Sequence, residues 1–176
     1  MNPKKTDRGR SAGDRDLTND TNQTKQLYSF GGNEPLVAAL ADAEVPFLVV
    51  GGLAVQFHVP ERVPDDLDLV IAPTLDAGRR LLRALVTIGT PGLFTPEEWE
   101  QHPRPAGFPL KKQFYADIFR APPWFNFEEQ WNAAHDARLF NTPVKVASKA
   151  ALVAWIEHAP NPKPKHLHDL ELLRAT

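Results

Sequence analysis

The sequence predicts an α/β or α+β domain with a small mixed β-sheet flanked by helices. Short apolar runs alternate with stretches whose apolar residues recur at helical spacing, and prolines and glycines separate the two kinds of segment. The 176 residues, of which 42% are hydrophobic and 24% charged, suffice for one buried core. These observations together predict a single globular domain.

The composition excludes several classes of site. The chain contains no cysteine, which rules out disulfides, thiolate zinc sites and cysteine nucleophiles. No apolar stretch approaches the roughly 20 residues of a membrane span, and the N-terminus lacks the apolar core of a secretion signal. We therefore expect a cytoplasmic protein without a membrane partner.

Residues 1–26 differ in composition from the rest of the chain. They contain no Val, Ile, Phe, Tyr or Trp and bury too little apolar surface to offset their ordering entropy. We expect a disordered tail here and a single domain over residues 27–176. The tail holds six basic and four acidic residues, so the domain carries 14 basic and 18 acidic residues, about −4 net charge. This balance gives no global basic surface for nucleic acid.

In the first half of the domain, the sequence predicts two helix–strand pairs and a third helix. A helix over Glu34–Ala43 precedes a strand at Phe47–Val50, and a short helix at Leu53–Phe57 precedes a strand at Leu67–Ile71. Thr74 then caps a helix that ends at Gly89. Its predicted buried stripe consists of Leu75, Leu82, Leu85 and Val86.

The second half predicts further strands and helices. Thr95 and Glu98 form a capping box for a brief helix around Trp99. Alternating apolar residues predict one strand within 108–119. The pattern in residues 137–148 predicts two short strands joined by a turn at Asn141 and Thr142. Ser148 caps a helix through Trp155, and a final helix begins near Pro164.

A glycine pair and an aspartate pair flank the first two strands. Gly51 and Gly52 end one strand and open a helix, where free amides and the helix dipole favour a phosphate; a plain tight turn is the ordinary alternative. Asp66 and Asp68 lie two residues apart and face one side of a strand. Two adjacent carboxylates repel unless a cation neutralises them, and magnesium prefers such oxygen ligands. An exposed strand and loop pair is the alternative.

Together, these residues resemble the core motif of the polymerase-β-like nucleotidyltransferase fold superfamily. The segment "GGLA" followed by "RVPDDLDL" is similar to the minimal-nucleotidyltransferase and abortive-infection-toxin branch, with Pro64 where threonine is usual. The resemblance implies a third carboxylate from a later strand, and Asp117 in "FYADIF" is the candidate. A lone exposed strand aspartate is the alternative for Asp117.

The last third resembles the same family more loosely. In "KPKHLHDLELL", Asp169 matches the family pattern, Lys163 stands where arginine is usual and His166 where aspartate is usual. The resemblance implies nucleotide contacts for Lys163 and His166. Arg62 is interpreted as a phosphate contact, as an ion-pair partner that orients the aspartates, or as an ordinary loop arginine.

The resemblance implies magnesium-dependent transfer of a nucleoside monophosphate from a nucleoside triphosphate to a hydroxyl of an unidentified acceptor. Asp66, Asp68 and Asp117 would hold one or two Mg²⁺ ions, and Gly51 and Gly52 would admit the phosphates. The acceptor class stays open among a small molecule, RNA and protein. The alternatives are a non-catalytic nucleotide-binding or regulatory module, and the toxin of a toxin–antitoxin pair acting on tRNA, which would have an antitoxin partner.

Aromatic and histidine side chains allow further interpretations. Trp124 or Phe125, close behind Asp117, is a candidate for stacking on a base or acceptor ring, although core packing is the ordinary role of such residues. His166 and His168 lie two apart on a predicted helix and cannot easily share one metal ion.

Overall fold

The computed structural model describes residues 24–29, 31–90, 94–101, 107–110 and 113–176. Within these residues, seven strands form one mixed sheet in the order β1-β6-β7-β2-β3-β5-β4. The strands are β1 (Lys25–Leu27), β2 (Phe47–Val50), β3 (Leu67–Ile71), β4 (Gly107–Pro109), β5 (Ala116–Arg120), β6 (His135–Leu139) and β7 (Thr142–Val146). The predicted fold class, a mixed sheet flanked by helices, is confirmed.

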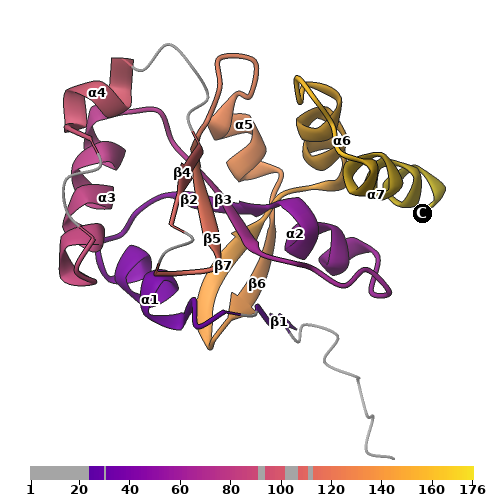
Figure 1. The fold of residues 1–176 in the computed structure, drawn as a ribbon, viewed down its shortest axis with the longest axis horizontal. Coiled ribbons are helices and arrows are strands. Elements are labelled where there is room, and N and C mark those ends of the chain that lie inside the picture. The colour runs from indigo at the N-terminus through magenta and orange to yellow at the C-terminus, as the bar shows by residue number, and fades with distance from the viewer. Residues whose placement is uncertain (1–23, 30, 91–93, 102–106, 111–112) are drawn as a thin grey trace, which may run out of the picture.

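Helices cover both faces of this sheet. They are α1 (Glu34–Asp42), α2 (Gly51–His58), α3 (Leu75–Thr87), α4 (Pro96–Gln101), α5 (Phe127–Asn132), α6 (Lys149–Glu157) and α7 (Pro164–Ala175). Helices α1, α3 and α4 lie on one side of the sheet, and α2, α6 and α7 lie on the other (Figure 1). The main core lies between the sheet and these two helical layers. In the described part of the chain, no helix combines the length and the apolar character needed to cross a bilayer.

The pairing of the central strands brings one end of β2 to the sheet edge at which β3 and β5 begin. Strand β2 is antiparallel to β3, and β3 is parallel to β5, so the end of β2 lies beside the starts of β3 and β5. All four residues of β2 are buried, which is typical of a central strand covered on both faces. Both β2 and β3 have the predicted bounds.

Several helix ends follow their sequence signals. The Thr74 and Ser148 side chains accept hydrogen bonds from the amides of Ala77 and Ala151, 3.2 Å away in each case. The Thr95 capping box also forms, and the final helix begins at Pro164 as predicted. These signals succeed because a cap is satisfied by residues within its own turn.

The predicted tail is too long at its C-terminal end. Lys25 and Gln26 belong to β1, which pairs in parallel with β6, while the predicted disorder of residues 1–23 lies outside the described residues. Backbone pairing needs no apolar side chain, and Leu27, 2% exposed, anchors the strand in the core. Lys25 also donates a hydrogen bond to the carbonyl of Phe57. Composition could not reveal these distant partners.

The strand predicted within 108–119 is present as β5, but the segment also contains part of β4, a separate strand antiparallel to β5. The amides of Gln113 and Phe114 both donate to the Leu110 carbonyl, which turns the chain before β5 begins. The turn between β6 and β7 lies one residue earlier than predicted, since Phe140 and Asn141 both have positive φ.

The predicted buried stripe of α3 is correct only at Leu85. Val86 is 60% exposed and Leu75 and Leu82 are half-buried, whereas the buried positions are Ala77, Gly78, Leu81, Ala84 and Leu85. Helix α4 presses Trp99 onto Gly78, where a Cβ would come within 2.9 Å of the Trp99 Cβ. Small residues are buried here because they admit a large neighbour, a choice that hydropathy does not encode.

Candidate active site

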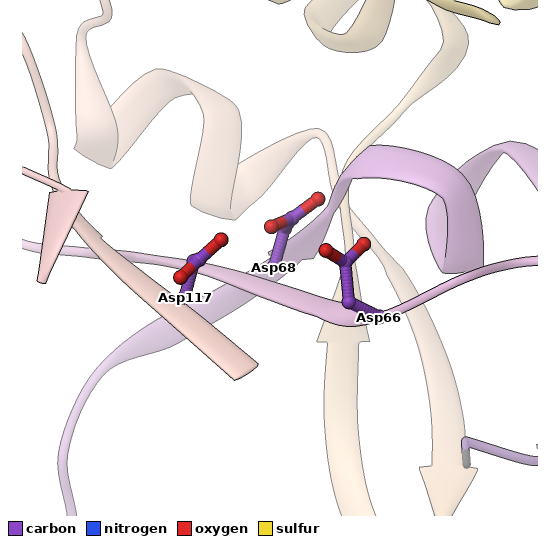
Figure 2. A group of neighbouring side chains, drawn as sticks. All are labelled: Asp66, Asp68 and Asp117. Atoms are coloured by element: carbon purple, nitrogen blue, oxygen red, sulfur yellow. The ribbon is translucent and has the colours of Figure 1, made fainter. Parts of the chain in front are cut away.

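Three carboxylates meet at the edge where β2 ends and β3 and β5 begin. Asp68 and Asp117 occupy the same register position on the adjacent parallel strands β3 and β5, and Asp66 lies just before β3. One oxygen from each of the three lies within 4.8 Å of the others, and all three residues are half-buried. Figure 2 shows the three side chains projecting to the same side of these strands. The expected convergence of Asp117 with the aspartate pair is therefore present.

Gly51 is required by this carboxylate group. Its φ of +62° is a conformation that residues with a Cβ rarely adopt, and a Cβ there would lie 2.0 Å from Asp68 Oδ2. The preceding residue, Val50, is the register partner of Asp68. A glycine at position 51 thus lets the chain turn into α2 directly against the Asp68 carboxylate.

Helix α2 begins without a side-chain cap. Val50 occupies the N-cap position and provides no side-chain cap. The first amides of a helix have no partner within the helix, and they attract negative charge. Gly52 avoids crowding beside this turn, because a Cβ at this position would lie only 3.2 Å from Arg62 Nη2. The glycine pair thus opens a helix, as the sequence predicts.

Arg62 forms a buried ion pair with α7. Its Nε lies 2.5 Å from Asp169 Oδ1 and its Nη2 lies 3.3 Å from Oδ2, with the side chains only 12% and 4% exposed. Nη1 donates to the Val63 carbonyl. The hydrogen bond to Asp169 is the main reason that the pKa of Arg62 is raised. Arg62 is therefore an ion-pair partner of Asp169, and the charges of Asp65 and Asp66 raise its pKa further.

The N-terminal turn of α7 brings cationic and polar groups to the same site. Lys165 Nζ lies 2.9 Å from Asp65 Oδ2, and this hydrogen bond raises the pKa of Lys165, with further contributions from Asp66 and Asp68. The same hydrogen bond lowers the pKa of Asp65. Lys165 therefore stays protonated beside the carboxylates.

His166 is held in one tautomer at this helix end. The Lys163 amide donates a hydrogen bond of 3.2 Å to His166 Nδ1, which places the proton of the neutral ring on Nε2. Burial, followed by the charge of Lys165, lowers the pKa of His166. His166 is thus set up as a neutral Nε2–H donor.

One cavity collects all of the predicted site residues. It contains about 910 Å³ of empty space, part of it open solvent. The predicted residues that line it are Gly51, Gly52, Arg62, Asp66, Asp68, Asp117, Lys163 and His166. Lys165, Asp169 and an apolar wall on α6 complete it.

The apolar wall was missed by sequence reasoning. Leu152, Trp155 and Ile156 recur at i, i+3 and i+4, which is the signature of one helix face, and Ala159 follows two residues after α6 ends; this helical pattern also describes ordinary core packing. Of the two predicted stacking candidates, Phe125 is only 4% exposed and Trp124 stacks on His158 with ring centroids 4.2 Å apart. Trp155 is instead the tryptophan that lines the cavity.

Comparisons with known proteins give distant structural likenesses. No family model and no curated protein matches the chain. The crystal structure of ANT(2")-Ia in complex with adenylyl-2"-tobramycin is 16% identical, with a TM-score of 0.48, covering 81% of this chain and 85% of that one. An antigenic nucleotidyltransferase-like protein from Paracoccidioides brasiliensis is 13% identical, with a TM-score of 0.41, covering 82% and 77%. At this distance, the assignment of function rests on the geometry of this chain's own residues.

Proposed function

We propose that this protein is a nucleotidyltransferase of the polymerase-β-like fold. It moves a nucleoside monophosphate from a nucleoside triphosphate to an acceptor hydroxyl. The observation that carries the proposal is the convergence of Asp66, Asp68 and Asp117 beside the turn at Gly51, where an uncapped helix begins. The neighbouring α7 contributes Lys163 and Lys165 to the same cavity. Metal-binding carboxylates, phosphate-binding amides and cationic groups thus share one site.

The three carboxylates suit magnesium. Their oxygens are hard ligands, and one oxygen from each lies within 4.8 Å of the others, so a divalent cation bound among them would offset their mutual repulsion. Asp66 and Asp68 would hold one ion against the triphosphate, and Asp117 would complete a second position. Magnesium bound there would offset the charge of the carboxylates and phosphates and make the acceptor hydroxyl more acidic.

Side chains of the cavity would move the acceptor proton and balance the charge of the leaving group. Asp117 orients the acceptor hydroxyl and takes its proton, and the hydroxyl oxygen then bonds to the α-phosphorus in line with the departing group. The bond from the α-phosphorus to the bridging oxygen breaks, and pyrophosphate leaves with the electron pair. Lys163, Lys165 and the Nε2–H of His166 are the cavity groups that balance the charge of the leaving pyrophosphate.

The third carboxylate favours transfer over a non-catalytic binding module. Two aspartates suffice to hold one metal–triphosphate complex, whereas Asp117 in register with Asp68 supplies the acceptor side of the reaction. The acceptor remains a hydroxyl compound of unassigned class, and a tRNA-directed toxin would use the same chemistry.

The test is transfer of label from α-phosphate-labelled triphosphates in the presence of magnesium. The purified protein is incubated with RNA, with its own polypeptide and with small polyhydroxylic acceptors. We expect labelled acceptor in at least one reaction and none in the Asp66→Asn/Asp68→Asn double variant. Nucleotide binding without any transfer would contradict the transferase proposal and favour a non-catalytic nucleotide-binding module.

A further inference from the structure

The cavity has a polar half and an apolar half. The carboxylates and the N-terminal turn of α7 form the polar half. The apolar half is the face of α6 that carries Leu152, Trp155 and Ile156, together with Ala159 just after the end of that helix. Phe119 joins the two halves, because it follows Asp117 by two residues on β5 and lines the same cavity. Two residues of strand span about 7 Å, a length that one ribose can bridge.

Trp155 is held in place by three other rings. Phe119 and Phe125 approach it at interplanar angles of 74° and 82°, with centroids 5.6 and 5.5 Å away. Trp124 lies at 5.7 Å and 50°. These edge and tilted contacts fix the indole, and none of the three rings lies parallel to it. A fixed indole that lines a cavity is a surface on which a flat ligand can stack.

We propose that Trp155 is the stacking surface for the nucleobase of the triphosphate, an inference that rests on the proposed function. The proposed reaction requires one aromatic ring whatever the acceptor is, and that ring is the base. With the α-phosphate at the carboxylates, the ribose lies beside Phe119 and carries the base to Trp155. The triphosphate extends in the other direction, toward α2 and the N-terminus of α7.

The chemistry of the wall also determines which bases it prefers. The cavity-lining side chains of α6 are all apolar except for the indole N–H, so this wall offers little hydrogen-bonding readout of a base edge. Stacking strength grows with the area of the ring, so purines bind better than pyrimidines. Adenine and guanine have rings of the same size and are therefore bound about equally.

The test compares nucleotides with a phosphate chain that lacks a base. Calorimetry with magnesium measures the affinities of ATP, GTP, CTP, UTP and inorganic tripolyphosphate. We expect ATP and GTP to bind alike, more tightly than CTP and UTP, and all four more tightly than tripolyphosphate. Trp155→Leu should weaken ATP binding about tenfold or more, the size of one stacking contact, and leave tripolyphosphate binding unchanged.

Trp131→Leu is the matched control. Trp131 packs against Phe127 and Lys145 and is not among the residues that line this cavity, so its loss should not change either affinity. Trp155→Phe keeps a smaller ring and should bind ATP with intermediate affinity. It also provides a second variant if Trp155→Leu does not fold, and the nucleotide ranking of the unmodified protein needs no variant.

Three results would overturn the inference. Equal affinities for ATP and tripolyphosphate would mean that no base site exists. Unchanged ATP affinity in Trp155→Leu, with a raised KM for the acceptor, would assign the indole to the acceptor. If neither ATP nor tripolyphosphate binds, the proposed function fails, and the base site fails with it.

Discussion

Asp68 and Asp117 are register partners on the parallel strands β3 and β5, although 49 positions separate them in the sequence. Parallel strands place equivalent positions side by side, so the two carboxylates project from neighbouring points of one sheet edge. Asp66, two positions before Asp68, joins them from just before β3. Because the three carboxylates come from different positions, substitutions at Asp68 and Asp117 can test nucleotide binding and turnover separately.

Asp68→Asn should abolish magnesium-dependent nucleotide binding while the fold is kept. The substitution removes one negative charge and one metal ligand with almost no change in volume. Calorimetric titration with magnesium and a nonhydrolysable triphosphate measures the effect, and circular dichroism checks the fold. Asp76→Asn, an exposed aspartate paired with Arg80, is the matched control and should bind normally. Unchanged binding in Asp68→Asn would contradict the role assigned to Asp68.

Asp117→Ala should still bind nucleotide through Asp66 and Asp68 but should lose turnover. The acceptor hydroxyl loses the group that takes its proton and aligns it, which is worth about 10²- to 10⁴-fold in rate for proton transfer alone. Single-turnover transfer of α-phosphate label, with calorimetry of nucleotide binding alongside, separates the two effects. Transfer at the normal rate would remove Asp117 from the mechanism.

Gly51→Ala should destabilise the fold and disturb the site together. A left-handed φ costs an ordinary residue about 1–2 kcal/mol, and the new Cβ would also collide with Asp68 Oδ2. Gly89→Ala is the matched control, because Gly89 has φ +74° and, among the described residues, only its own chain neighbours lie within 4 Å of where a Cβ would stand. Urea unfolding should therefore show a larger loss of free energy for Gly51→Ala. Equal losses would mean that the contact with Asp68 relaxes without cost.

Arg62→Met should lower the free energy of unfolding by about 3–5 kcal/mol, the usual cost of leaving a buried charge without its partner. The uncompensated group is Asp169, whose side chain is 4% exposed. Arg80→Met is the control, since Arg80 pairs with exposed Glu44 and Asp76 and should cost less than about 1 kcal/mol. The double variant Arg62→Met/Asp169→Leu should recover part of the loss in urea unfolding. Equal effects of the two single variants would show that the buried pair adds nothing special.

His58 should make the protein less stable in mild acid. Burial is the main reason that the pKa of His58 lies below its ordinary value of 6.5; the hydrogen bond to the Ala147 carbonyl opposes this, and His135, Lys149 and Lys25 add to the lowering. The unfolded chain therefore takes up the proton first as the pH falls below about 6.5, and protonation favours unfolding until the folded pKa is passed. Thermal midpoints between about pH 7 and about pH 5 should fall less steeply in His58→Gln. Parallel profiles for the two proteins would assign the acid sensitivity to other groups.

The local features of this protein could be predicted from its sequence. The caps at Thr74, Thr95 and Ser148, the strands at Phe47–Val50 and Leu67–Ile71, and the pairing of Asp66 with Asp68 depend on residues within one turn or two positions of one another. Asp117 could be proposed only because a family resemblance implied a third carboxylate.

Tertiary structure decided the remaining features. The Arg62–Asp169 pair spans 107 positions, the short strand β1 depends on β6, and α3 buries Gly78 because Trp99 packs there. Trp155 belongs to a pattern of apolar residues typical of any core-facing helix, and only the packing of α6 over β5 shows that it lines the cavity. The sequence alone determined the local backbone and the chemistry available to the site, because caps and strand periodicity act over a few residues. Which distant side chains share the cavity depends on how the layers pack, and a pattern of neighbouring residues does not contain that information.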